Sequence, residues 1–277
     1  MKHPLIVNRV RNSVWAIKPE TLEAICEAVE ASEGNDAPIM AKPSILVEGR
    51  EEEEMDQKPY DVIGNTAVVP VVGIIGKHLS MLEMACGGAS IDAFSAALKQ
   101  AASDPAVSNV LLYILSPGGV VTGVQETAEV IREIRKTKKV IAYTDDLMCS
   151  AAYWLGLQAD AVYSSTSATV GSIGVYMLQI DNSRALEMEG VKVNAISAGK
   201  WKLLGASFKP LTEEERSVMQ AGVDKVYTDF KREVNILRNI KDENLQGQVF
   251  DGEEAVEAGL TDGIFNSLED LIEFLND

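Results

Sequence analysis

The sequence holds a candidate serine nucleophile, Ser150, but almost no histidine to activate it. The only histidines are His3 and His78. A serine hydroxyl is a weak nucleophile until an adjacent general base accepts its proton, and histidine is the side chain that most often does so. Any nucleophile–base pair formed after residue 78 must therefore use another base. A desolvated lysine is the best candidate among the side chains that remain.

Ser150 lies between a predicted strand and a predicted helix. The run TDDLMCSAAYW (144–154) follows a strand expected at 140–143, and its small residues predict a helix that begins near Ser150. We expect the serine to be exposed above the sheet, where a helix N-terminus favours negative charge on its oxygen. The ordinary alternative is a serine that only caps the helix. Cys149 competes as nucleophile but has no histidine nearby to activate it, so we interpret it as a buried structural thiol.

Two glycine-containing segments offer supporting groups for such a nucleophile. SPGG (116–119) leads from a strand into a helix, so its backbone N–H groups can approach a developing oxyanion. An ordinary Pro-Gly turn explains this tetrapeptide equally well. ATVGSIGV (168–175) is typical of a glycine-flanked strand along a cleft, in which Ser172 can hold a base by hydrogen bonding. Packing alone also explains these glycines.

The candidate bases are two lysines in SAGKWK (197–202), which follows the apolar run 191–196. In an extended chain Lys200 and Lys202 share one face and Trp201 points the other way, so spacing does not choose between them. An ordinary surface lysine is the alternative for both. Either lysine can act as a base only if burial and nearby positive charge leave part of its amine neutral near pH 7 to 8.

The elements around these residues alternate between strand and helix patterns. Apolar runs predict strands at 67–75, 110–115 and 140–143, and helical spacing predicts helices at 90–102, which Ser90 caps, and 121–135. This order predicts an α/β fold with a mostly parallel sheet flanked by helices and ligands held at the carboxyl ends of the strands. A capping box, Thr212-x-x-Glu215, opens a further long helix. Its expected buried stripe consists of Met219, Val223, Val226, Phe230, Val234 and Leu237.

Composition and charge exclude several functional classes. With 277 residues, 46% of them hydrophobic, the chain can bury a full-sized core. The formal net charge of −17 argues against nucleic-acid and anionic-membrane partners, since phosphate binding needs concentrated Lys and Arg. Three cysteines without a CxxC pair or a nearby histidine predict neither a disulfide framework nor a zinc site. No segment matches a signal peptide or a membrane span, so we expect a soluble cytoplasmic protein.

The first 62 residues differ in character from the rest. Helical spacing predicts one amphipathic helix at 19–31, and the charged stretch 48–61, which contains Glu51 to Glu54 in a row, is typical of a solvated linker. We therefore divide the chain into an N-terminal appendage with an acidic linker (1–62) and a catalytic domain (63–277).

Five motifs in this order resemble peptidase family S49, which comprises signal peptide peptidase A-like enzymes and phage capsid-maturation proteases. They are SPGG (116–119), CSAAYW (149–154), TVGSIGVY (169–176), AGKWK (198–202) and VFDGEEAVEAGLTDGI (249–264). Each motif is weak alone, and together they cover roughly residues 66–265. The resemblance implies a ClpP/crotonase-like fold with a small N-terminal helical appendage.

The resemblance also assigns roles within the site. It places the nucleophile at Ser150 and the base 52 residues later (202 − 150 = 52), which selects Lys202 over Lys200. Ser172 matches the serine that orients the lysine. Gly118 and Gly119 match the oxyanion loop, and the Ala151 amide is a second donor. No cofactor or metal is implied.

The same resemblance suggests a substrate and an assembly. The segment NRVRNSVWAIKPETLEAICEAVE (8–30) is similar to the leader of phage head proteases, which implies processing of scaffold or capsid precursors in the host cytoplasm or procapsid. No scaffold-like extension follows the core, so we expect a separate scaffold substrate. Family members form rings or domes, which implies a homo-oligomer in which serine and lysine can come from neighbouring subunits.

Two alternatives to the peptidase remain open from the sequence. ClpP itself is disfavoured, because its mechanism needs a histidine after the serine and none is present. A crotonase-fold acyl-CoA enzyme shares the glycine loop and a similar A-x-x-x-G-L tail (255–260). A non-catalytic capsid assembly factor is favoured by the acidic stretch and the N-terminal helix, both suited to protein contacts.

Overall fold

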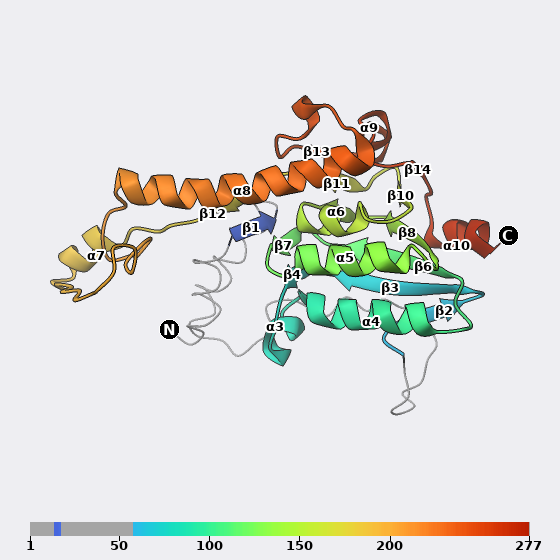
Figure 1. The fold of residues 1–277 in the computed structure, drawn as a ribbon, viewed down its shortest axis with the longest axis horizontal. Helices are drawn as coiled ribbons and strands as arrows, with labels where there is room; N and C mark the ends of the chain where they lie inside the picture. Colours follow the sequence, from blue (N-terminus) through green and yellow to red (C-terminus); the bar gives the residue numbers. More distant parts are fainter. Residues whose placement is uncertain (1–13, 18–57, 277) are drawn as a thin grey trace.

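Three β-sheets with helices packed against them form the described part of the protein. The computed structural model describes residues 14–17 and 58–276 (Figure 1). The strand orders are β14-β10-β8-β6-β3-β2, β12-β1-β7-β4-β5 and β13-β11-β9. Most pairings in the six-stranded sheet are parallel, and β2 is its antiparallel edge. The predicted α/β fold with a mostly parallel sheet is confirmed.

The strands are short outside the centre of the large sheet. They are β1 (Val14–Ile17), β2 (Asp61–Ile63), β3 (Thr66–Val72), β4 (Ile74–Gly76), β5 (Gly88–Ser90), β6 (Asn109–Leu115), β7 (Gly118–Val120), β8 (Lys139–Thr144), β9 (Leu147–Cys149), β10 (Ala161–Ser164), β11 (Thr169–Gly171), β12 (Tyr176–Met177), β13 (Val249–Phe250) and β14 (Gly263–Ile264).

The described helices fall mainly between the strands that they connect. They are α3 (Met81–Ala85), α4 (Ile91–Ser103), α5 (Val124–Ile134), α6 (Ala151–Gly156), α7 (Ser183–Met188), α8 (Glu213–Arg238), the short 3-10 helix η1 (Asp242–Asn244), α9 (Gly252–Glu257) and α10 (Leu268–Asn276). The expected cap of α4 is present, because the Ser90 hydroxyl accepts a hydrogen bond from the Ala93 N–H at 3.2 Å.

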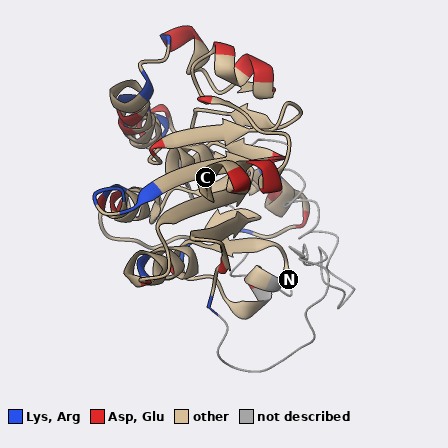
Figure 2. Ribbon diagram, turned by 90° about the vertical axis from the view of Figure 1, so that its right-hand side faces the viewer, with Lys and Arg blue, Asp and Glu red and all other residues tan. Residues whose placement is uncertain are grey.

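The central strands are buried on both faces, which explains their nearly continuous apolar sequence. Leu112 on β6 and Ala142 on β8 face the layer formed by α4, α5 and α6, whereas Leu111 and Ile141 face α10 on the opposite side. Figure 2 shows the strands almost free of charged residues, whereas many acidic and basic residues lie in the helices. The sheet is therefore a rigid platform whose strand ends can hold a site.

One predicted strand is in fact two strands. The expected strand 67–75 breaks at Gly73, and β3 and β4 on either side of it join different sheets. Gly73 has φ +100°, and a Cβ there would lie 2.1 Å from the Gly87 carbonyl oxygen. Only glycine fits this turn, so the continuous apolar run hid a change of sheet.

The long helix α8 begins at the predicted capping box but is buried over less of its length than expected. Thr212 and Glu215 cap it reciprocally. Of the predicted stripe only Phe230 and Val234 are buried, and Leu237 is exposed. The helix is about 39 Å long at 1.5 Å per residue, so its first half extends past the sheets instead of packing on them (Figure 1).

The N-terminal part of the chain contributes to the sheets. The predicted helix 19–31 and nearly all of the acidic stretch lie outside the described residues. The proposed domain boundary at residue 62 falls inside β2, which pairs with β3. Farther upstream, β1 pairs with both β7 and β12. Among the described residues, no helix is long and apolar enough to cross a membrane.

Candidate active site

Ser150 lies in a strained turn between β9 and α6. Its backbone angles are φ 56° and ψ −119°, a conformation that residues other than glycine rarely adopt. It is the first residue before α6, but its side chain makes no capping hydrogen bond, so the helix-cap alternative does not hold. Its hydroxyl donates instead to the Gly174 carbonyl at 3.3 Å. A strained strand-to-helix turn is how several hydrolases present a nucleophilic serine.

Ser150 is completely buried, so the expectation that it is exposed was wrong. The reason is the strand β7, whose backbone packs directly against it: a Cβ on Gly118 would lie 3.0 Å from the Ser150 Cβ. Cys149 beside it is also fully buried, with its thiol directed at the Thr169 carbonyl, as expected for a structural thiol. The aromatic Tyr153, one turn into α6, is enclosed as well. Burial raises the pKa of its hydroxyl, which stays protonated and donates to the Leu260 carbonyl at 2.9 Å.

Ser172 is held next to Ser150 by strand pairing. The parallel strands β9 and β11 end together, with Cys149 opposite Gly171, and the Ser150 N–H donates to the Gly171 carbonyl at 2.7 Å. Ser172 follows at once, also with a positive φ of 53°, and its N–H donates to the Gln248 carbonyl at 2.7 Å. Its side chain makes no hydrogen bond within the described part of the chain. The two predicted serines are therefore brought together.

The two glycines of the predicted oxyanion loop differ in what their amides face. The Gly118 N–H is taken by the Ser116 hydroxyl at 3.2 Å. Gly119 lies opposite Ala16 of β1, and the Val121 N–H donates to the Val14 carbonyl at 3.3 Å. Because hydrogen-bonded pairs alternate along an antiparallel ladder, the Gly119 N–H points toward β1.

Both glycines are required sterically in this strand. A Cβ would lie 2.2 Å from the Ala16 carbonyl oxygen at Gly118 and 2.0 Å from the Ile75 carbonyl oxygen at Gly119. The segment is therefore a tightly packed strand and not an ordinary surface turn. At Ala151, the first residue of α6, the amide has no carbonyl partner inside the helix. Gly119 and Ala151 are thus the two candidate oxyanion donors.

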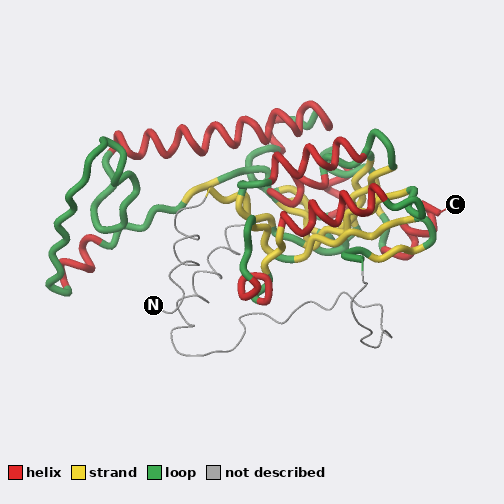
Figure 3. The backbone as a smooth tube through the Cα atoms, turned by 60° about the horizontal axis from the view of Figure 1, so that its bottom comes forward, coloured by secondary structure: helices red, strands yellow, loops and turns green. Residues whose placement is uncertain are grey.

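Both candidate lysines lie on an arm, residues 178–212, that extends away from the sheets (Figure 3). No residue between 174 and 214 is fully buried. Lys200 and Lys202 lie in a turn rather than an extended strand, so the alternation expected for them does not apply. The Lys200 amine forms an ion pair with Glu214 and lies 4.6 Å from the centre of the Trp201 ring. Lys202 is exposed and its amine forms no ion pair with any described residue.

Ser150 and Lys202 are therefore not brought together within one chain. Ser150 is enclosed between β7, β9 and α6, whereas Lys202 is on the exposed arm. The arm is folded back on itself, since the Asn182 N–H donates to the Ser207 carbonyl at 2.6 Å, and the Lys209–Glu215 ion pair of 2.5 Å fixes its junction with α8. It is thus a structured element whose contacts within the described residues are with itself and with the N-terminal half of α8.

A polar and aromatic cluster ties α6, which carries Ser150 at its start, to the C-terminal half of α8. Trp154 stacks on Phe230 with ring centroids 4.3 Å apart and an interplanar angle of 3°. The Glu233 carboxylate accepts hydrogen bonds from the Trp154 indole at 2.9 Å, from Gln158 at 2.9 Å and from Arg132 at 3.2 Å. The helix that begins after Ser150 is therefore tied to α8 and, through Arg132, to α5.

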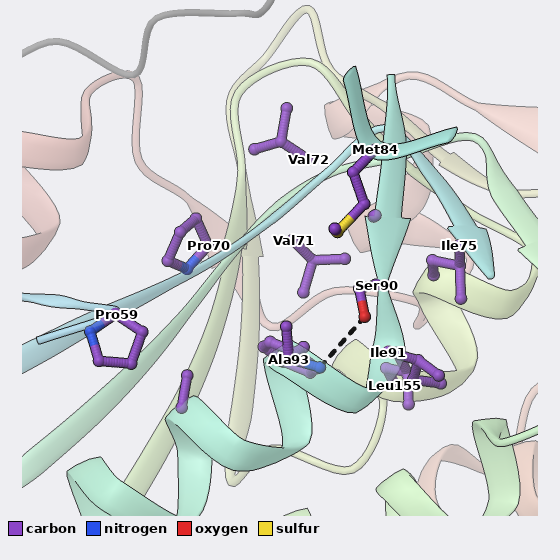
Figure 4. A pocket seen from close by; sticks show the side chains of 13 residues that line it. Pro59, Pro70, Val71, Val72, Ile75, Met84, Ser90, Ile91, Ala93 and Leu155 are labelled. Carbon is purple, nitrogen blue, oxygen red and sulfur yellow. Dashed lines mark hydrogen bonds between the residues drawn. The ribbon is translucent and has the colours of Figure 1, made fainter. Parts of the chain in front are cut away.

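An apolar pocket of about 280 Å³ is lined mainly by residues of β3, β4, β5 and α4 (Figure 4). Its lining includes Ile75, which pairs with Gly119, and Leu155 of α6, so it lies close to the same two elements that hold Ser150. Ser90 is the polar side chain in its wall, and its hydroxyl is occupied by the cap of α4. The pocket can hold an apolar side chain but offers no acid or base.

Comparison with known proteins places the part of the chain that carries these residues in a protein family. A family model described as peptidase family S49 matches residues 132–276, just over half of the chain, including Ser150, Ser172 and Lys202. The chain belongs to peptidase family S49. The predicted resemblance to that family is confirmed.

The similar S49 relatives include two phage proteins. Capsid assembly protease C of Escherichia phage lambda is 31% identical over 83% of this chain and 53% of its own length. Head-tail preconnector protein GP5 of Enterobacteria phage P21 is 32% identical over 81% of this chain and 46% of its own length. The chain thus spans about half the length of these two relatives. Among solved structures, an enoyl-CoA hydratase/isomerase family member is similar with a TM-score of 0.42 and 12% identity, over 78% of this chain and 72% of that one.

The sequence reasoning missed one element of this S49 site, the strand β1. Its four residues, VWAI, are apolar and come just before the predicted N-terminal helix. A run this short is ambiguous in sequence, and nothing in it indicates pairing with a strand that lies a hundred residues away. Its position beside the glycine loop became visible only in the fold.

Proposed function

We propose that the protein is a serine endopeptidase in which Ser150 is the nucleophile and Lys202 the general base. The observation that carries the proposal is the strained turn at Ser150, which holds the hydroxyl beside the glycine strand β7 and the start of α6 in an S49 chain. Strain of this kind costs about 1–3 kcal/mol and is found mostly at functional sites. No histidine follows residue 78, so the base must be of another type.

The proposed reaction has two steps. The neutral amine of Lys202 takes the proton of the Ser150 hydroxyl as its oxygen attacks the peptide carbonyl, and Lys202 then gives that proton to the leaving amine. Water releases the acyl group from Ser150 by the reverse proton transfers. The amides of Gly119 and Ala151 stabilise the oxyanion, with Gly118 shaping the strand, and removal of one such donor typically costs about 100- to 1,000-fold in rate. Ser172 positions the lysine amine.

We further propose that Lys202 acts on Ser150 of a neighbouring subunit in a homo-oligomer. The arm that carries Lys202 has apolar side chains that the described residues leave uncovered, including Ile196, which is 100% exposed, and Met188. Such residues on one projecting element mark a protein–protein contact. Lys202 would lose its solvent in that contact, which favours the neutral amine that the reaction needs.

The proposed substrate is a protein precursor of a phage head, such as a scaffold or capsid protein. Support comes from the two phage relatives, whose names refer to capsid assembly and to the head–tail preconnector. The excess negative charge of the chain agrees with a protein substrate and not a nucleic acid.

Substitution of the two lysines and the serine tests the dyad. Ser150→Ala and Lys202→Ala should each lower cleavage of a phage scaffold protein by at least about 100-fold, the range expected for loss of a general base. Lys200→Ala is the matched control, because Lys200 lies two residues away and is paired with Glu214. It should keep most of the activity. Undiminished cleavage by Lys202→Ala would contradict the dyad.

A covalent probe separates an enzyme from a non-catalytic assembly factor. A fluorophosphonate should label Ser150 in the intact protein, and mass spectrometry of the tryptic peptides should locate the adduct there. The absence of any adduct, in a protein that circular dichroism shows to be folded, would favour the assembly role. A cleavage rate that rises with pH would support a lysine base, because only the neutral amine accepts a proton.

A further inference from the structure

The strand β1 lies in a slot beside Ser150 that has the form of a peptide-binding site. It runs antiparallel to β7 on one side and to β12 on the other, with Trp15 opposite both Val120 and Tyr176. We infer that an extended substrate peptide binds in this slot and that Val14–Ile17 fills it as an intramolecular substrate mimic. The inference rests on the proposed peptidase function, since it concerns the regulation and substrate class of that same site.

The position of one backbone carbonyl supports this assignment. A Cβ placed on Gly118 would lie 2.2 Å from the Ala16 carbonyl oxygen and 3.0 Å from the Ser150 Cβ. The Ala16 oxygen and the Ser150 Cβ are therefore no more than 5.2 Å apart. The ladder directs the Gly119 N–H to this same residue of β1. A peptide carbonyl that lies near Ser150 and faces a predicted oxyanion donor is positioned as a scissile carbonyl would be.

The side chains of β1 indicate which peptides the slot accepts. Trp15 and Ile17 pack with Val120 in a small apolar cluster, which Tyr176 of β12 also joins. Ala16 points to the opposite face, into the main core, and is completely buried. Main-chain pairing with two strands gives affinity for any extended peptide, and the alternate side chains give selectivity. The slot therefore suits a large apolar residue, a small residue and a second large apolar residue in succession.

Occupation by β1 makes the site self-blocked. Because β1 belongs to the same chain as the slot, its binding is intramolecular and competes with any substrate peptide. Substrate can pair with β7 only after β1 has left, so release of β1 is a control point for the enzyme. Weakening β1 should open the slot, and fixing β1 to β7 should close it.

A reversible disulfide tests this inference by peptide binding, without catalysis. Trp15 and Val120 are a non-hydrogen-bonded antiparallel pair, whose Cα atoms are about 4.5 Å apart and within disulfide range. In the Ser150→Ala protein, Trp15→Cys with Val120→Cys should bind a fluorescein-labelled peptide of residues 11–20 when reduced and lose at least about 10-fold in affinity when oxidised. Trp15→Cys alone should not respond to oxidation.

Two further measurements complete the test. The Ser150→Ala protein that also carries Trp15→Asp should bind the peptide at least about 10-fold more tightly than the Ser150→Ala protein alone. The reason is that β1 without Trp15 is held less firmly in the slot. The matched control peptide carries Ala16→Trp and should bind at least about 10-fold more weakly than the original. Equal binding by the oxidised and reduced double-cysteine proteins would overturn the inference, even if Trp15→Asp fails to fold.

The test also separates the inference from the proposed function. Binding to the Ser150→Ala protein does not need a dyad. Redox-dependent binding together with no cleavage by a Trp15→Asp protein that retains Ser150 would therefore contradict only the peptidase function. Binding that does not depend on oxidation, together with an active wild-type protein, would contradict only the inference that β1 mimics a substrate.

Discussion

At the scale of single residues, two serines with left-handed backbone angles stand side by side where β9 and β11 end. Neither Ser150 nor Ser172 is a glycine, although each position would suit one better. Strand pairing holds them there, through the hydrogen bond from the Ser150 N–H to the Gly171 carbonyl. Hydroxyl groups retained at two strained neighbouring positions indicate that the side chains are needed.

This reasoning predicts a conflict between stability and activity at Ser150. Ser150→Gly should stabilise the protein by up to about 1 kcal/mol, because glycine adopts φ 56° without strain, and should abolish cleavage. Urea unfolding and a peptidase assay on the same protein measure the two effects. Ser164→Gly in β10 is the control and should destabilise, since that serine lies in a regular buried strand. A destabilised Ser150→Gly protein would contradict the strain argument.

A second residue-scale prediction concerns acid stability. The Asp104 carboxylate accepts hydrogen bonds from the Lys58 ammonium at 2.5 Å, the Ala106 N–H at 3.0 Å and the Tyr60 hydroxyl at 3.0 Å, and these lower its pKa to about 2. A carboxyl whose pKa is lower in the folded state stabilises the fold above its unfolded pKa, near 3.9. That contribution is lost as the pH falls towards 2.

Asp104→Asn should therefore be less stable than the wild type at neutral pH, and the difference should shrink between about pH 4 and pH 2. Thermal melts followed by circular dichroism at a series of pH values measure it. If the wild type and the variant differ by the same amount at every pH, the carboxylate does not contribute in this way.

At the scale of elements, α8 serves two purposes along its length. Its C-terminal half packs on α6 through Phe230, and its N-terminal half holds the arm outside the sheets. Phe230→Ala should cost about 3–5 kcal/mol, because it removes a fully buried ring stacked on Trp154. Ile236→Ala on the same helix is the control, since Ile236 is 73% exposed and should change stability by less than about 0.5 kcal/mol. Urea unfolding measures both changes. Similar losses of unfolding free energy in the two variants would contradict the assignment of the packing role to Phe230.

The sequence was sufficient for elements whose signals are local. The capping box at Thr212, the cap at Ser90 and the apolar strand β6 lie where periodicity and capping chemistry predict them. Features that depend on distant pairing were not predictable. The break at Gly73 depends on the approach of Gly87, and β1 depends on β7 and β12.

The same distinction applies to the candidate site. Ser150, Ser172 and the glycine loop converge because strand ends of one fold meet, which the β-α-β order implies. The burial of Ser150 could not be predicted, because it depends on how closely β7 approaches it. Neither could the position of Lys202, because the arm that carries it has no buried side chain to fix a pattern.

At the scale of the whole molecule, Ser150 is enclosed, whereas the arm exposes apolar side chains that the described residues do not cover. The exposed apolar residues Ile180, Met188, Val191, Val193, Ile196 and Trp201 lie on that arm. An assembly in which each arm covers a neighbour would satisfy both features and would bring one lysine to each serine.

Mixing two inactive proteins tests this arrangement. Ser150→Ala retains Lys202, and Lys202→Ala retains Ser150, so a mixed oligomer contains sites in which an intact serine meets an intact lysine from its neighbour. With equal amounts and random assembly, one half of the serines and one half of the lysines are intact, and activity should return to about one quarter of the wild-type value. If both groups came from one chain, every site would lack either its serine or its lysine, and mixing would restore no activity.

A variant of the arm tests the contact itself. Adding Ile196→Asp to both proteins should remove the recovered activity, because a charge in the apolar arm contact blocks assembly. Glu189→Asp on the same arm is the control and should leave the recovery intact.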